Sequence, residues 1–124
     1  MTAEPRGHTV ELHPSSDRVR VEIDGRTVAD SNRPILVHET GLPVRLYLPA
    51  ADVDLSLFEP SDTKTWCPYK GTASYWTYRG AGDSSAAPLP DVAWSYVDPI
   101  AAVQDIRGHL CFADAAARVT REAG

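Results

Sequence analysis

The stretch RVRVEIDGRTVADS, residues 18–31, predicts a β-hairpin and points to a fold built from strands. Its first half has the two-residue period of a strand with one solvent-facing side: Val19, Val21 and Ile23 alternate with Arg18, Arg20 and Glu22. Asp24-Gly25 can supply the positive φ angles of a type I′ turn. Residues 27–29 are then expected to return as the partner strand.

Four further segments have strand character. PILVHE (34–39) and VRLYLP (44–49) are rich in β-branched and apolar residues, and TGLP (40–43) can turn the chain between them. By alternation, Arg45 and Tyr47 share one face of the second segment, and the leucines and valine share the other. TASYWTYRG (72–80) and DVAWSYV (91–97) carry the aromatic residues that strands favour. The small polar loop 80–90 between them is expected to be mobile.

The remaining segments are less regular. Residues 50–62 are too short and irregular for a helix, and Pro60 is expected to end whatever turn forms there. One short helix is predicted after Asp98, with Pro99 in its first turn. HLCFA (109–113) predicts a final buried strand, and the tail 114–124 has modest helical propensity.

Length and charge limit the classes of function. A chain of 124 residues with 43% apolar and 23% charged content fits one globular domain. We expect a loosely held arm over residues 1–17 and a single domain over residues 18–124. The chain has 17 acidic residues and only 12 basic ones, and the basic residues are scattered. It therefore lacks the stripe of basic residues that binding to a phosphate backbone requires. Nucleic acid and anionic membranes are therefore poor partners, and whether two copies pair as a homodimer is left open.

The expected location is the cytoplasm. No segment approaches the roughly 20 apolar residues that cross a bilayer, and MTAEPRGHTVELHP lacks the apolar region of a secretory signal. Cys67 and Cys111 are the two cysteines, and in a reducing compartment such thiols are more often free than bridged.

Several uncommon residues occur in a characteristic order. They are the turn Glu39-Thr40-Gly41, Tyr47 with Pro49, the block CPYKGTASYW (67–76), the block AWSY (93–96), and Gly108 before Phe112. Over about residues 19 to 113 the chain resembles the bacterial and fungal family catalogued as domain of unknown function four hundred and twenty-seven.

The resemblance implies an all-β domain of the β-tent kind, in which antiparallel sheets meet at an angle over a pocket, with one or two short helical turns. The family's label has also suggested nucleotidyl transfer, which needs clustered carboxylates to hold Mg²⁺. Asp52 and Asp54 form a D-x-D, but no Gly-Ser motif that opens a helix precedes them. Two lone cysteines cannot form the four-ligand zinc site of some β-tent relatives. We therefore expect no metal and no cofactor.

The candidate catalytic residues are Cys67, Lys70 and Glu39. If Pro68 and Gly71 bend the chain, the Lys70 ammonium can approach Cys67 and lower the pKa of its thiol. The opposing interpretation is a buried, inert cysteine beside a surface lysine. Glu39 ends an apolar run, where a carboxylate must be solvated or paired, and Arg45 across the turn is one candidate partner.

The candidate ligand-binding residues are Arg45, Tyr47, Tyr75 and Trp94. Aromatic residues are most often core, yet tyrosine hydroxyls and indole N–H groups need partners when they are buried. An aromatic wall beside charged groups suits a small planar or polar ligand. The leading hypothesis is thus a small-molecule pocket. The alternatives are an enzyme with Cys67 as a thiolate, and a non-catalytic protein-interaction module with an exposed aromatic patch.

Overall fold

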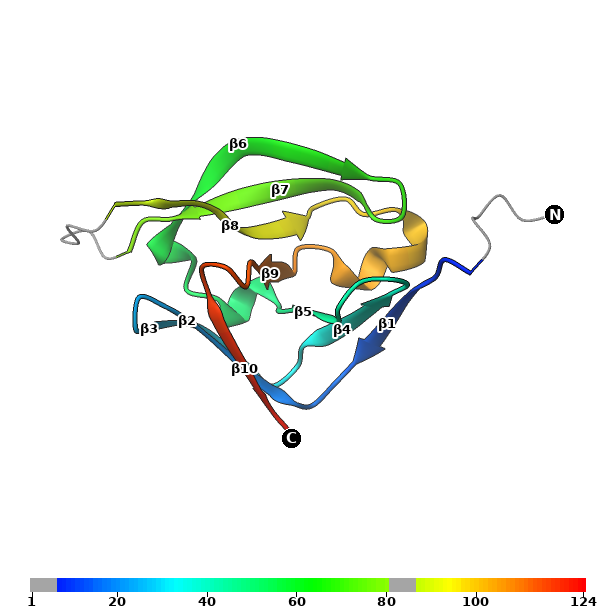
Figure 1. The fold of residues 1–124 in the computed structure, drawn as a ribbon, viewed down its shortest axis with the longest axis horizontal. Helices are drawn as coiled ribbons and strands as arrows, with labels where there is room; N and C mark the ends of the chain where they lie inside the picture. Colours follow the sequence, from blue (N-terminus) through cyan, green and yellow to red (C-terminus); the bar gives the residue numbers. More distant parts are fainter. Residues whose placement is uncertain (1–6, 81–86) are drawn as a thin grey trace.

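The computed structural model describes residues 7–80 and 87–124 (Figure 1). Those residues form ten strands and three short 3₁₀ helices. The strands are β1 (Val10–Pro14), β2 (Arg18–Ile23), β3 (Arg26–Ser31), β4 (Ile35–Glu39), β5 (Arg45–Tyr47), β6 (Phe58–Cys67), β7 (Gly71–Tyr78), β8 (Leu89–Tyr96), β9 (Leu110–Phe112) and β10 (Arg118–Glu122). The helices are η1 (Ala50–Asp52), η2 (Leu55–Leu57) and η3 (Ala101–Ile106). The expected all-β class with short helical turns is confirmed.

The strands form three antiparallel sheets, ordered β1-β4-β5, β10-β2-β3 and β6-β7-β8-β9. Figure 1 shows the four-stranded sheet on one side of the molecule and the two three-stranded sheets on the other. Leu48, just after β5, and Leu110 in β9 exchange two backbone hydrogen bonds of 2.8 Å. This bridge joins the two sides, so β5 and β9 lie at the centre of the fold.

The first hairpin forms as its sequence predicts. Asp24 and Gly25 have φ angles of 52° and 76°, as a type I′ turn requires. Val19, Val21 and Ile23 are each at most 1% exposed, so the apolar face of β2 is fully covered. The hairpin β4–β5 also forms, with Gly41 at φ 80° in its turn.

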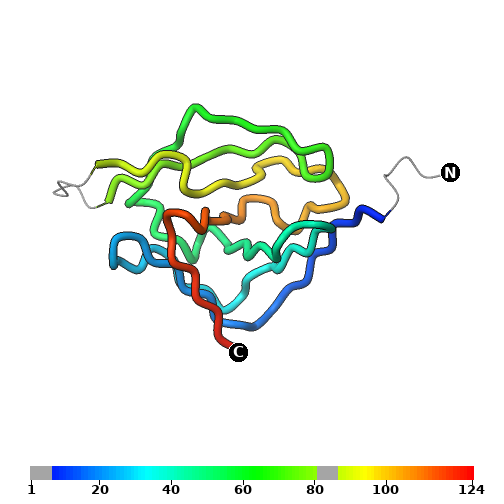
Figure 2. The backbone as a smooth tube through the Cα atoms, viewed as in Figure 1, coloured from blue at the N-terminus to red at the C-terminus, as the bar shows by residue number. Residues whose placement is uncertain are grey.

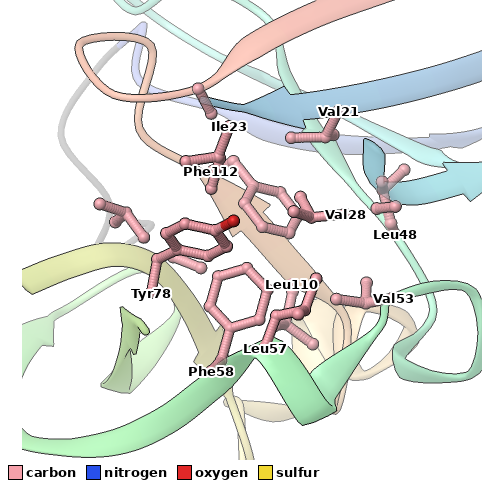
Figure 3. Packing of buried hydrophobic residues seen from close by; sticks show 14 of the residues in the cluster. Val21, Ile23, Val28, Leu48, Val53, Leu57, Phe58, Tyr78, Leu110 and Phe112 are labelled. Atoms are coloured by element: carbon pink, nitrogen blue, oxygen red, sulfur yellow. The ribbon is translucent and has the colours of Figure 1, made fainter. Parts of the chain in front are cut away.

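Strand β5 separates two apolar clusters. Leu46 and Leu48 pack into the first cluster, which also holds the face of β2 and the rings of Phe58, Tyr78 and Phe112 (Figure 3). Tyr47 points the other way, into a second cluster with Val37, Tyr96 and Ile106 among its members. The alternation along β5 therefore gives each face of this strand its own surroundings.

The ends of the chain correct two expectations. The loose arm predicted over residues 1–17 is wrong for Val10–Pro14, because β1 pairs with β4 along its whole length (Figure 2); residues 1–6 of the arm lie outside the described residues. The prediction of HLCFA as the final strand is also wrong, because the tail, which has modest helical propensity, contains strand β10, and β10 pairs with β2. Each of these strands is stabilised by backbone pairing with the edge of a sheet formed by distant segments. This tertiary pairing outweighs the weak local propensity of the two segments for strand structure.

The middle of the chain holds further differences. Strand β6 begins at Phe58 and runs through Pro60, which is tolerated because β6 is the edge strand of its sheet. The predicted helix after Asp98 is the 3₁₀ helix η3. In the loop 80–90, which is expected to be mobile, residues 81–86 lie outside the described residues.

Candidate functional site

A hollow of about 210 Å³ lies between the β4–β5 hairpin and strands β7 and β8. Six of the seven predicted site residues line it, namely Glu39, Arg45, Tyr47, Lys70, Tyr75 and Trp94. They come from four strands and one turn, so the fold gathers residues that are far apart in sequence. Val37, Leu42, Pro43 and Tyr96 complete the lining.

A buried ion pair forms one end of the hollow. The Lys70 ammonium donates to the Glu39 carboxylate, and the two side chains are only 10% and 8% exposed. The other carboxylate oxygen lies 3.2 Å from Nε2 of His8, whose ring stacks on Tyr69 at 3.9 Å. Two charges this deep need mutual pairing, because either one alone would carry a large desolvation cost.

The turn between β6 and β7 places Lys70. Its backbone N–H donates to the carbonyl of Cys67 at 3.2 Å, and its carbonyl accepts from Ile100 at 3.0 Å. Gly71 follows with φ at 114°, a conformation that L side chains rarely adopt. The glycine is therefore required where the chain turns back into β7.

Arg45 forms the other charged part of the site. Its guanidinium carbon lies 5.6 Å from the centre of the Trp94 ring, and its Nη1 lies 3.4 Å from Asp114. The proposed Glu39–Arg45 pair is wrong in this structure. Arg45 stands opposite Val37 in the register, while Glu39 is already bonded to Lys70.

The aromatic wall is held by hydrogen bonds. The Trp94 indole N–H donates to the Tyr47 hydroxyl at 3.0 Å, and the Tyr75 and Trp94 rings lie 6.3 Å apart. The hydroxyl of Tyr75 is 2.9 Å from that of Thr65. Burial raises the pKa of Tyr47 and, on the same wall, that of Tyr96. Both hydroxyls therefore stay neutral near pH 10, where exposed tyrosines ionise.

Cys67 is the predicted site residue that does not line the hollow. It is free and half-buried, and the ammonium expected beside its thiol is bonded to Glu39 instead. A nucleophilic cysteine normally also needs a histidine base. His38 packs on His13, and His109 lies 3.1 Å from the carbonyl of Arg107, so both of these histidines have other contacts. The geometry thus lends no support to a Cys67 nucleophile.

The carboxylates of the D-x-D motif are tied to protein partners. Asp52 accepts hydrogen bonds from Ser31 at 2.7 Å and Arg33 at 3.1 Å, and Asp54 caps η2 by accepting from Ser56. Within residues 7–80 and 87–124, no three His, Cys, Asp or Glu side chains are grouped so that they could hold a metal ion.

Tyr96 and Asp114 belong to the site but were not among the seven predicted site residues. Tyr96 shares a strand face with Trp94, so the two-residue period was a signal for it. Asp114 follows β9 and meets Arg45 only through the tertiary fold, and nothing in the local sequence marks it.

Fold and site together define a small β-sheet domain with a charged, aromatic-walled hollow between its sheets. The chain belongs to the family described as Domain of unknown function (DUF427), which matches residues 11–123. The search of curated proteins found no match. Across the described residues, no helix combines the length and apolar character needed to cross a membrane.

Proposed function

We propose that this domain binds a small flat molecule that carries an anionic group, in the hollow between β5 and strands β7 and β8. The observation that carries the proposal is the convergence of Arg45 and the Glu39–Lys70 pair on one aromatic-walled space. Binding sites commonly combine apolar walls with a few placed polar groups. Tyr47, Tyr75 and Trp94 supply the wall in this hollow.

The charges suggest how such a ligand would be oriented. Arg45 is 35% exposed and its partner Asp114 is 76% exposed, so their ion pair is weak and a ligand anion can replace the aspartate. Glu39 and Lys70 neutralise each other and are buried, so they are better suited to hydrogen-bond a polar group than to bind a second charge. The anion would therefore lie at Arg45, and a hydroxyl or amine at the opposite end.

The size of the hollow limits the ligand. Its volume of about 210 Å³ is below the roughly 300 to 1,000 Å³ of pockets for drug-sized molecules. A single substituted ring fits this scale better than a nucleotide.

Both cysteines are free, which is consistent with a cytoplasmic location, and we propose that location for the domain.

Ligand binding is favoured over the two alternatives. The thiolate enzyme requires a charge partner for Cys67, and Lys70 is bonded to Glu39. The interaction module predicts exposed aromatics without a concavity. Trp66 is 73% exposed on the edge strand, but it is not part of the site, whose aromatic residues Tyr47, Tyr75, Trp94 and Tyr96 line the hollow.

Calorimetric titration with benzoate and 4-hydroxybenzoate tests the proposal. Both probes should bind saturably, with 4-hydroxybenzoate tighter, because its hydroxyl can reach the Glu39–Lys70 end. Arg45→Gln should weaken both by about tenfold or more, since a hydrogen bond to a charged group contributes about 1.5–3 kcal/mol.

Arg33→Gln is the matched control. Arg33 also pairs with one aspartate, Asp52, and its side chain is 61% exposed, but it does not line the hollow. Its substitution should leave both affinities unchanged. If the wild-type protein binds neither probe, or if Arg45→Gln binds them as well as the wild type, the proposed function is wrong.

A further inference from the structure

We infer that a second hollow, on the opposite face of β5, binds a short unbranched aliphatic carboxylate whose head group pairs with Arg45. This hollow has a volume of about 190 Å³ and lies where β2, β5, β9 and β10 meet. It differs from the first hollow in the chemistry of its walls. The inference does not depend on a ligand in the first hollow.

Eight of the ten lining side chains are apolar. They consist of Val19, Val21, Val44, Leu46, Leu48 and Val119, together with Phe112 and Cys111. Val19, Val21 and Leu48 are at most 1% exposed, so they form a buried floor. Apart from Cys111, whose thiol is a weak donor, these side chains carry no hydrogen-bonding group.

The backbone at the floor is also satisfied. The N–H and carbonyl of Leu48 are both bonded to Leu110 at 2.8 Å. A polar ligand inserted here would leave its own polar atoms without partners, which is costly. A hydrocarbon chain has no such atoms and gains from leaving water.

Two charged side chains belong to the same lining, and they define the head group. Arg45 and Asp114 both line the hollow, and their closest approach is 3.4 Å. Because the pair is solvent-exposed and long, it contributes little, and a carboxylate on the ligand can take the place of Asp114 on the guanidinium. Asp114 then competes with the ligand carboxylate for the guanidinium of Arg45.

Arg45 lines both hollows. One guanidinium therefore serves as the anion partner on both faces of β5. An aliphatic and an aromatic carboxylate that both pair with it should exclude each other, although their apolar parts would occupy different spaces.

The test uses butanoate, pentanoate and hexanoate on the full chain, with binding followed by NMR of the valine and leucine methyl groups. Each added methylene that is buried contributes about 0.8 kcal/mol, so affinity should rise roughly fourfold per carbon. The methyl resonances of Val44, Leu46 and Val119, whose side chains are accessible in this hollow, should shift, while the indole N–H of Trp94 shifts less. Hexanol, which lacks the carboxylate, should bind at least about tenfold more weakly than hexanoate.

Two exposed substitutions sharpen the test. Asp114→Asn should tighten hexanoate binding a few-fold, because it removes the competitor, and Arg45→Gln should weaken it about tenfold or more. Arg33→Gln should have no effect. The inference is overturned if the carboxylates do not bind, if affinity is independent of chain length, if Asp114→Asn fails to tighten binding, or if the shifts cluster at Trp94 and Tyr75. Benzoate binding that persists in any of these cases would leave the proposed function intact.

Discussion

Lys70 and Glu39, which are 31 residues apart in sequence, form a buried ion pair that joins the turn after β6 to the end of β4. The pair links the four-stranded sheet to the β1-β4-β5 sheet beside the hollow. Its side chains are nearly enclosed, so it is both a structural contact and a source of polarity in an aromatic site.

Loss of either charge should destabilise the fold. Lys70→Met or Glu39→Gln should lower the free energy of unfolding by about 3 kcal/mol or more in urea titrations, because each leaves a buried partner unpaired. The double variant should lose at least about 1 kcal/mol less than the sum. Asp30→Asn breaks the exposed pair with Arg18 and should cost less than about 1 kcal/mol. Strict additivity of the first two changes would contradict the described pair.

Asp52 should make stability depend on pH in the acid range. Hydrogen bonds from Arg33 and Ser31 hold the pKa of its carboxyl below the usual value of 3.8. A lowered folded-state pKa means that the carboxylate stabilises the fold above the unfolded-state pKa and that this contribution is lost as pH falls through the folded-state pKa.

Asp52→Asn should therefore unfold more easily than the wild type at pH 6, by about 1 kcal/mol. The difference should shrink steadily below about pH 4. The measurement is urea unfolding of both proteins from pH 2.5 to pH 7. A difference that stays constant over this range would mean that the ionised form of Asp52 does not stabilise the folded state.

The two cysteines should react at very different rates. Burial raises the pKa of the Cys111 thiol to about 12, so almost none of it is thiolate at pH 8. Iodoacetamide should label half-buried Cys67 at least about a hundredfold faster than Cys111, as read by peptide mass spectrometry. Lys70→Met should not slow the labelling of Cys67 in the folded protein. A marked slowing would restore the thiolate hypothesis.

Much of the fold follows from local patterns. The alternation of residues 18–23 and the Asp24-Gly25 turn are sufficient for the first hairpin, because both act over neighbouring residues. Strands β1 and β10 could not be foreseen in the same way. Each depends on a sheet edge supplied by a distant segment, β4 in one case and β2 in the other.

The site divides along the same line. Residue chemistry indicated which side chains would gather, and the structure brings six of the seven named residues to one hollow. The ion pairs among the site residues could not be predicted, because the Glu39 carboxylate and the Arg45 guanidinium both bind partners on other elements. Lys70 and Asp114 reach them only through the arrangement of the sheets.

The buried tyrosines should resist ionisation. Burial raises the pKa of Tyr47 and Tyr96, so neither should titrate in the folded protein up to about pH 11, whereas exposed tyrosines titrate near pH 10. Absorbance at alkaline pH should show a slow second phase that coincides with unfolding. Tyr47→Phe should cost about 1 kcal/mol, because it leaves the Trp94 indole N–H without its acceptor. Full ionisation of every tyrosine before unfolding would contradict this.

Arg45, Trp94 and the Glu39–Lys70 pair line one hollow, in which we propose that the ligand binds. A crystal structure grown with 4-hydroxybenzoate tests it most directly. The carboxylate of the probe should lie on Arg45, its ring against Trp94 and its hydroxyl toward Glu39 and Lys70. A probe seated elsewhere, or a hollow closed by side chains with Arg45 still on Asp114, would contradict the claim.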